Sequence, residues 1–257
     1  MKNIPICRYC GKPYKKNPHI LEGLPDFIKE KIIYIPDCDC LEIQKEKEME
    51  ELEKKRVEEC KANRIKRFRD ISLIDEKFRL STFERADMSQ NYIKIARAFA
   101  EKFIEKGTAP KGILFYGGVG TGKTYASSCI GNYLMDSGKT VVVMNMGLYI
   151  GKIQREWAEA EKDLLSYIKD SDLLIIDDFG AEKISEFVIE KTFAMIDTRY
   201  RALKPLIITT NLNIEEIGER FGARIADRIS EMCFPILVTG MSKRGADTKR
   251  KFMEFLK

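Results

Sequence analysis

The 257 residues suffice for one full α/β domain with a small appendage, and the 44% hydrophobic content allows a sizeable core. Charged residues make up 33% of the chain and the formal net charge is +5, which permits a polyanionic partner without requiring one. The sequence has no uncharged apolar run of about 18 residues, and residues 1–14 lack the apolar core of a signal peptide. We therefore expect a cytoplasmic protein without membrane contact, whose cysteines are reduced thiols or metal ligands.

The first 40 residues contain four of the seven cysteines, five of the eight prolines and the only histidine. A segment this small cannot build much core and needs a staple. One cysteine pair has C-x₂-C spacing followed by a glycine, as in a zinc knuckle, and the other pair is C-x-C. We predict a structural Zn²⁺ site with four thiolate ligands. The expected zinc ligands are Cys7, Cys10, Cys38 and Cys40.

Two alternatives to this zinc site stay open. The C-x-C pair departs from the usual spacing, so His19 is a possible substitute for one cysteine. The other alternative is a set of free thiols. The remaining cysteines, at positions 60, 129 and 233, are interpreted as packing residues.

Residues 41–69 contain no Gly or Pro and are rich in Glu, Lys and Arg, which predicts a long exposed helix. Its end, from Lys61 to Arg69, carries basic residues with no acidic residue among them. This basic end either contacts phosphates or is a solvated helix face.

A globular pattern begins near residue 78. Residues 89–106 have the apolar spacing of an amphipathic helix. Short apolar strands then alternate with helical stretches, which predicts a parallel sheet covered on both faces. The expected strands are Gly112–Tyr116, Thr140–Asn145, Asp172–Asp177, Pro205–Thr210 and Pro235–Thr239.

Residues 117–124 read GGVGTGKT and match G-x-x-x-x-G-K-[ST] between an expected strand and an expected helix. Glycines let the backbone wrap around phosphate oxygens, and the helix N-terminus offers free N–H groups. We expect Lys123 to reach the β- and γ-phosphates of ATP and the Thr124 hydroxyl to bind Mg²⁺. The expected nucleotide-binding residues are Gly117, Gly118, Val119, Gly120, Thr121, Gly122, Lys123 and Thr124.

Two further strand ends carry polar side chains. DLLIIDDFG at 172–180 predicts a buried strand that ends in two carboxylates. We expect Asp177 to hold Mg²⁺ and Asp178 to polarise the attacking water, although additional-strand ATPases usually have a Glu at the second position. LIITTN at 206–211 places the amide of Asn211 at a strand end, where it can sense the γ-phosphate.

GGVGTGKT, IIDDFG, ITTN and RFGARIADRI together resemble the AAA+ helicase-loader ATPases of the DnaC/DnaI type and the related IstB transposition helpers, over about residues 78–245. The resemblance implies a P-loop AAA+ (ASCE) core, an α/β fold with a five-stranded parallel sheet and little or no C-terminal lid. It also implies an ATPase that is slow and stimulated by DNA or a partner. Such a protein loads the replicative DNA helicase onto single-stranded DNA as an ATP-dependent homo-oligomer.

The resemblance also assigns roles to particular arginines. Arg228 matches the arginine finger that reaches the ATP of a neighbouring subunit, and Arg224, one helical turn earlier, is the alternative. Arg244 matches the sensor-II arginine. For each of them, a surface ion pair is the competing interpretation.

The domain division also follows the resemblance. We expect a zinc-binding module that contacts the helicase at 1–40, a charged helical linker at 41–77 and the AAA+ ATPase domain at 78–257. Loaders carry an extra helical element between the second and third strands, on the DNA side of the assembly. Here that stretch contains Lys152, Arg155 and Trp157, and we favour a helix that simply covers the sheet.

Two other functions compete with the helicase loader. A transposition helper ATPase has the same core but is not expected to carry the zinc module. A P-loop kinase for a small molecule needs an Arg-rich lid after the fourth strand, and no such segment is evident in the sequence.

Overall fold

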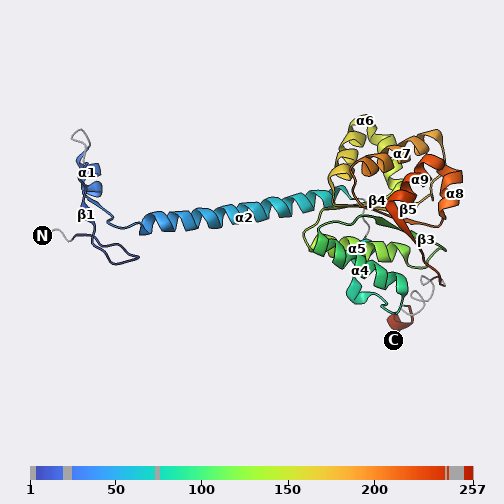
Figure 1. The fold of residues 1–257 in the computed structure, drawn as a ribbon, viewed down its shortest axis with the longest axis horizontal. Coiled ribbons are helices and arrows are strands. Elements are labelled where there is room, and N and C mark those ends of the chain that lie inside the picture. Colours follow the sequence, from blue (N-terminus) through green and yellow to red (C-terminus); the bar gives the residue numbers. More distant parts are fainter. Residues whose placement is uncertain (1–3, 20–24, 73–75, 241, 243–251, 257) are drawn as a thin grey trace. The chain divides into compact units, whose positions relative to one another are not determined.

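The computed structural model describes residues 4–19, 25–72, 76–240, 242 and 252–256 (Figure 1). The chain divides into two compact units, Met1–Cys60 and Lys61–Lys257. Within the described ranges, no helix combines the length and the apolar character that a membrane crossing requires.

A tight loop near the N-terminus begins the first unit. Ile6 and Pro13 form an isolated antiparallel bridge that closes the loop. Inside it, the Cys7 N–H donates to the Lys12 carbonyl at 2.7 Å and the Gly11 N–H donates to the Cys7 carbonyl at 2.8 Å. Gly11 has φ +72°, a left-handed conformation that glycine adopts without a steric penalty.

The first unit also contains a small two-stranded sheet and a short helix. Strand β1 (Lys15–Lys16) pairs antiparallel with β2 (Tyr34–Ile35), and helix α1 (Asp26–Ile32) lies between them in the chain. Lys15 also forms an exposed ion pair with Asp37 at 2.8 Å. An exposed pair contributes little stability, so this unit depends on some other staple.

Helix α2 (Cys40–Ile71) is the expected long charged helix, and it extends two residues further than predicted at its C-terminal end. Phe68 is the only buried residue among its 32 residues. The Phe68 ring meets Tyr167 edge-on at a centroid distance of 5.1 Å. A helix that is polar almost all round is stabilised by its good helix formers and by this terminal anchor.

The second unit contains a five-stranded parallel sheet, as the sequence predicts. Its strands are β3 (Gly112–Tyr116), β4 (Val141–Asn145), β5 (Leu173–Phe179), β6 (Leu206–Thr210) and β7 (Cys233–Leu237). They lie in the order β4-β5-β6-β3-β7, and all pair in parallel. Strand β6 therefore separates the strand before the glycine-rich loop from the strand that ends in two acids. This insertion is the defining feature of the additional-strand class.

Four of the five strands of this sheet differ from their expected bounds. β4 and β6 each begin one residue later than predicted, at Val141 and Leu206. β5 begins one residue later and ends two residues later than predicted, and β7 begins and ends two residues earlier. β7 contains Pro235, which lacks an N–H donor. Proline is tolerated there because β7 is an edge strand that pairs only with β3.

Helices cover both faces of this sheet (Figure 1). On one face lie α4 (Asn91–Lys106) and α5 (Lys123–Asp136), with α3 (Glu76–Arg79) and the 3₁₀ turn η1 (Phe83–Arg85) beside them. On the other face lie α6 (Met146–Asp170), α7 (Glu186–Arg201), α8 (Ile214–Phe221) and α9 (Ala223–Met232). Successive strand residues alternate between the two cores, as Ile207 and Ile208 do.

One arginine is fully buried at the amino edge of the sheet. Arg199 of α7 has no exposed surface. Its guanidinium donates to the carbonyls of Ile168, Ser171, Asp172 and Pro205 at 2.8–3.0 Å. Burial lowers the pKa of Arg199 to about 9, so the group stays charged at neutral pH. The side chain joins the end of α6 to the starts of β5 and β6.

Replacing Arg199 by alanine should lower the free energy of unfolding by about 3 kcal/mol or more, because several buried carbonyls lose a charged donor. Urea unfolding of the whole chain measures the loss. Arg201→Ala is the matched control, since its side chain is 76% exposed and pairs with Asp197 at the surface. Its cost should stay below about 1 kcal/mol. Equal losses in the two variants would contradict the assigned role of Arg199.

Candidate functional site

The loop between β3 and α5 requires its glycines for steric reasons. Gly117 has φ +132°, and a Cβ there would lie 2.5 Å from the Val238 carbonyl oxygen. Gly122 has φ +108°, and a Cβ there would lie 2.6 Å from the Tyr92 hydroxyl. Only glycine combines these conformations with such close neighbours. The sequence-predicted phosphate loop thus has the backbone shape that phosphate cradling needs.

Lys123, the first residue of α5, points back into this loop and is only 6% exposed. Its Nζ donates to the carbonyls of Gly117 at 2.9 Å and Gly118 at 2.6 Å, and to Asn211 Oδ1 at 2.9 Å. Phosphate oxygens are acceptors of the same kind and carry more charge, so the ammonium can exchange partners when a nucleotide binds. The pairing of β3 with β6 brings Asn211 to this position.

Tyr92 of α4 also contacts the phosphate loop and supports it. Its side chain is buried, and its hydroxyl donates to the Thr121 carbonyl at 3.1 Å. The Thr121 hydroxyl donates in turn to the Gly118 carbonyl at 3.0 Å. Val119 is 64% exposed. The apolar spacing of residues 89–106 predicts the helix that carries Tyr92, but only the fold shows the contact of Tyr92 with the loop.

The two acids at the end of β5 differ in exposure and backbone conformation. Asp177 is partly buried, whereas Asp178 is exposed and has φ +52°. The pairing of β5 with β6 shifts register between Ile176 and Phe179. A positive φ outside glycine is a strained conformation that often marks functional sites.

Two threonines of β6 hold this strand end. The Thr209 hydroxyl donates to Asp177 Oδ1 at 2.5 Å and accepts from the Asp178 N–H at 3.1 Å. The Thr210 hydroxyl donates to the Phe179 carbonyl at 2.6 Å. Sequence reasoning singled out only the asparagine that follows them. The ITTN pattern could have indicated these contacts, because two consecutive hydroxyl side chains in a buried strand need hydrogen-bond partners.

Thr124 is the second residue of α5 and is partly buried. Its carbonyl accepts the hydroxyls of Ser127 at 3.0 Å and Ser128 at 2.6 Å within the helix. The carboxyl ends of β3 and β5 share one edge of the sheet, which is where parallel α/β sheets bind ligands. A magnesium ion held by Thr124 and Asp177 fits this donor set of hydroxyl and carboxylate oxygens, and the assignment stays a prediction.

A sequence model of the IstB-like ATP binding protein family matches residues 39–251. The chain belongs to this family. Its core is that of the AAA+ P-loop ATPases, as the glycine-rich loop, the strand order and the acid pair indicate. The match includes α2 but not the first 38 residues, which hold three of the four clustered cysteines.

Similar proteins include the replicative helicase loader DnaC of Escherichia coli (strain K12), which is 29% identical over 142 residues. That match covers 54% of this chain and 57% of DnaC, so it spans little more than half of the relative's length. The crystal structure of DnaI has a TM-score of 0.57 at 23% identity and covers 65% of this chain and 96% of DnaI. A crystal structure of the DnaC helicase loader has the same TM-score at 21% identity. This match covers 64% of this chain and 100% of the DnaC chain.

In this IstB-like protein Arg228, on α9, is engaged within its own chain. Its Nη2 lies 2.7 Å from Asp197 Oδ1 of α7. The guanidinium carbon lies 4.5 Å from the centroid of the Phe193 ring and 5.3 Å from that of Tyr200. In this conformation Arg228 braces α9 against α7 through an ion pair and cation–π contacts. A role as arginine finger requires it to leave Asp197, and that role stays a prediction.

The other candidate residues of the IstB-like chain differ in exposure and in how far the structure describes them. Arg224 is exposed on the first turn of α9, and Arg244 lies outside the described residues. In α6, Lys152 is partly buried, Arg155 is exposed, and the side chain of Trp157 lies outside the described part. The buried side of α6 packs on the sheet, as expected of a covering helix.

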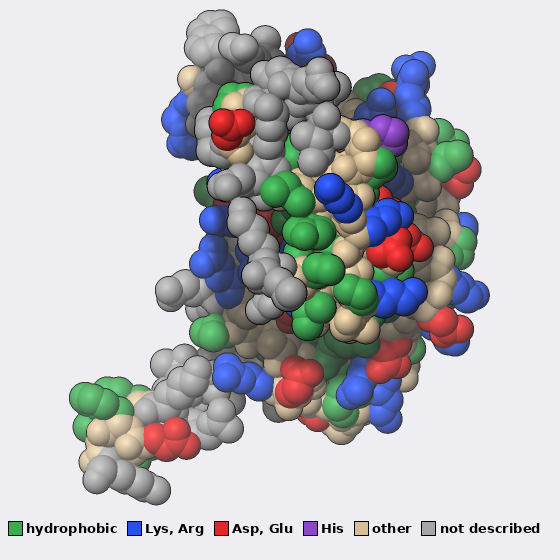
Figure 2. All heavy atoms as spheres, turned by 90° about the vertical axis from the view of Figure 1, so that its left-hand side faces the viewer, with side chains coloured by type: hydrophobic (Ala, Val, Ile, Leu, Met, Phe, Trp, Pro, Cys, Tyr) green, Lys and Arg blue, Asp and Glu red, His purple; other side chains and the backbone are tan. Residues whose placement is uncertain are grey.

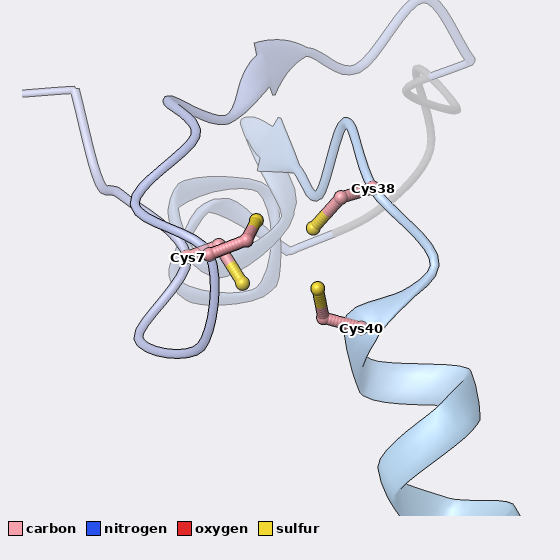
Figure 3. A group of neighbouring side chains, drawn as sticks. Cys7, Cys38 and Cys40 are labelled. Atoms are coloured by element: carbon pink, nitrogen blue, oxygen red, sulfur yellow. The ribbon is translucent and has the colours of Figure 1, made fainter.

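The four N-terminal cysteines come together although 27 residues separate the two pairs. Their Sγ atoms all lie within 4.8 Å of one another. Figure 3 shows Cys7, Cys38 and Cys40 pointing toward a common centre, Cys40 from the first turn of α2. Four ligands about 2.3 Å from one zinc ion lie about 3.8 Å apart, so this group fits a tetrahedral site.

Electrostatics in the cluster also fit a cation. Backbone N–H groups of Tyr9 and Cys10 lower the pKa of Cys7 to about 6. Hydrogen bonding with Cys10 is the main cause that raises the pKa of Cys40 to about 12. Without a cation the crowded thiols cannot all ionise, and a divalent metal would remove that conflict. His19 is exposed and is not a member of the group found among the described residues.

The basic side chains at the end of α2 are exposed to solvent. They are Lys61, Arg64, Lys66, Arg67 and Arg69. Arg64 lies over the Phe68 ring at 5.7 Å, and Arg69 approaches Asp136 at 3.9 Å. Figure 2 shows Lys, Arg, Asp and Glu side chains interspersed on the face that it draws. The exposure of the basic side chains and these two contacts do not decide between a phosphate contact and a solvated face.

Proposed function

We propose that this protein is an ATP-dependent DNA replication protein that binds a replicative DNA helicase and loads it onto single-stranded DNA. The observation that carries the proposal is the likeness of its ATPase core to a curated relative named replicative helicase loader DnaC. The match covers 57% of that relative, so the helicase and the DNA are proposed partners.

The proposed chemistry is hydrolysis of ATP to ADP and inorganic phosphate. The loop N–H groups and Lys123 bind the β- and γ-phosphates. Thr124 and Asp177 would hold magnesium, which would supply positive charge against the charge that develops on the phosphate oxygens. Asp178 accepts a proton from water as the water oxygen bonds to the γ-phosphorus and the bond to the ADP oxygen breaks. Asn211, already in contact with Lys123, reports on the γ-phosphate.

Assembly of several copies on ATP is part of the proposal. Arg228, or Arg224 in its place, reaches the nucleotide of the neighbouring subunit, and Arg244 acts as the sensor-II arginine. Single-stranded DNA is bound by basic side chains and stacking, largely without sequence readout. Hydrolysis is slow in the free chain and is stimulated by DNA or the helicase.

The N-terminal module is proposed to bind zinc and to contact the helicase. The proposed division is a zinc module at 1–40, a helical linker at 41–77 and the ATPase domain at 78–257. The boundary between the two compact units, after Cys60, falls inside α2, so this helix belongs partly to each. A rigid helix in this position can act as a spacer between the module and the ATPase.

Co-purification with the replicative helicase of the source organism tests the proposal. The intact chain should form a complex that survives size-exclusion chromatography, and a chain without residues 1–60 should lose it. Binding that survives the truncation would move the contact to the ATPase core. Absence of binding by the intact chain, with and without ATP, would refute the loader function.

The family match favours one second candidate, a transposition helper, because the matching model is that of IstB-like ATP binding proteins. A helper delivers a transposase to DNA and uses the same ATPase core. Specific capture of a transposase in place of a replicative helicase would establish this alternative.

Arg228→Ala should leave ATP affinity unchanged and lower turnover in the assembled state by about 1,000-fold, the effect expected of a trans-acting finger. Turnover is compared at protein concentrations below and above assembly. Arg224→Ala is the matched control on the same helix. If Arg224→Ala loses turnover and Arg228→Ala does not, the finger is Arg224 and Arg228 only braces α9 on Asp197.

A further inference from the structure

One buried hydroxyl lies between the two acids of the nucleotide site. Thr209 of β6 has no exposed surface. Its Oγ1 lies 2.5 Å from Asp177 Oδ1 and 3.1 Å from the backbone nitrogen of Asp178. Nothing in the sequence motifs assigns a role to this residue.

The direction of both hydrogen bonds is set by their chemistry. An ionised carboxylate only accepts and an amide N–H only donates, so the Thr209 hydroxyl donates to Asp177 and accepts from Asp178. Its proton is therefore directed at Asp177, and the hydroxyl has no surface in contact with bulk solvent. The side chain fixes the carboxylate of Asp177 and the backbone of Asp178 at the same time.

The backbone at Asp178 needs such support. Its φ of +52° is strained for a residue with a side chain. The register of β5 against β6 shifts between Ile176 and Phe179, which takes the Asp178 N–H out of the regular ladder. The Thr209 hydroxyl supplies the acceptor that a strand carbonyl would otherwise provide. Without it, the turn that directs the Asp178 carboxylate loses its buried hydrogen bond.

The next residues of β6 have different partners. Thr210 bonds to backbone groups of Phe179 and Leu212, which shapes the strand end. Asn211 contacts Lys123. Among these three described residues, Thr209 is the one whose hydrogen bonds join both acids.

We propose that Thr209 is a positioning residue for ATP hydrolysis, whose hydroxyl orients the metal-holding acid and the acid that accepts the proton of the attacking water. This inference rests on the proposed function, which gives Asp177 and Asp178 those roles. In this role Thr209 acts through the two acids, with which its hydroxyl forms hydrogen bonds.

The test compares Thr209→Val with the wild-type chain. Valine keeps the branched shape and removes the hydroxyl. Turnover should fall about 100-fold, the usual cost of a small misplacement at a reacting centre. Magnesium is expected to tighten ATP binding. The Mg²⁺ concentration needed for half of this effect should rise about tenfold, because the lost hydroxyl orients a metal ligand. ATP affinity in EDTA should change by less than about threefold, because the phosphate loop is untouched.

Two further variants separate positioning from folding. Thr209→Ser restores the hydroxyl and should recover turnover to within about fivefold of wild type. Thr192→Val is the matched control, because Thr192 of α7 is equally buried and its hydroxyl donates to the Val188 carbonyl at 2.7 Å. This variant should lose similar stability while keeping turnover and magnesium dependence.

Unchanged turnover and magnesium dependence in Thr209→Val would overturn the inference, and so would failure of Thr209→Ser to recover either quantity. The magnesium readout needs no hydrolysis. If the wild-type chain binds ATP but does not hydrolyse it, hydrolysis in the proposed function fails. The magnesium comparison between Thr209→Val and Thr209→Ser then still decides whether Thr209 orients the acid.

Discussion

Lys123→Ala should weaken ATP binding by about 100-fold or more. Charge-assisted hydrogen bonds contribute about 1.5–3 kcal/mol each, and about 1.4 kcal/mol corresponds to a tenfold change in affinity. Lys123 is the buried ammonium of the phosphate loop, so no other described side chain replaces it at the carbonyls of Gly117 and Gly118. Calorimetric titration of ATP into the whole chain measures the loss.

Lys102→Ala is the control for this variant. Lys102 is 65% exposed on α4 and pairs with Glu105 at 2.6 Å, so its removal costs one surface ion pair and the same unit of charge. ATP affinity should not change in this variant. If thermal unfolding confirms that Lys123→Ala is folded and its ATP affinity is unaltered, the assignment of the phosphate site to the loop at 117–124 is contradicted.

Zinc removal should unfold the N-terminal unit and leave the ATPase unit folded. The purified chain should contain one zinc ion, and structural zinc sites contribute about 10–16 kcal/mol at neutral pH. After chelation or in Cys38→Ser, residues of the first unit should lose protection from hydrogen exchange. ATP affinity should stay within about threefold of wild type, because Lys123 and its partners belong to the other compact unit.

Cys60→Ser provides the matched control for the zinc site. Cys60 is an exposed cysteine of α2, so its interpretation as a packing residue was wrong, and it is not a member of the four-sulfur group. This variant should keep its zinc and its exchange protection. Protein that holds no zinc when expressed with the metal, or a first unit that stays protected after chelation, would contradict the zinc assignment and leave four free thiols.

The two units therefore report on different parts of the proposed function. Loss of zinc should abolish helicase binding while ATP binding persists. If the helicase complex forms without ATP, Lys123→Ala should abolish ATP binding while helicase binding persists. A variant that loses both activities would indicate that the units depend on each other. That result would place the helicase contact partly on the ATPase core.

Features that depend on chain neighbours were readable from the sequence. The phosphate loop needs a strand, a glycine-rich turn and a helix in immediate succession, and residues 117–124 supply that order. The long helix follows from a composition without Gly or Pro, and alternating strands and helices predict the parallel sheet. The C-x₂-C and C-x-C pairs likewise indicate a metal site from spacing alone.

The tertiary structure decided which distant residues meet. Strand order puts β6 between β3 and β5, and this arrangement joins Asn211 to Lys123 and Thr209 to the acid pair. The order depends on how two hydrophobic cores pack on opposite faces of the sheet, which no local motif encodes. Partners such as Asp197 for Arg228 also come from packing between helices. Motifs formed by neighbouring residues can be predicted from the sequence, whereas contacts across the sheet exist only once the whole core has formed.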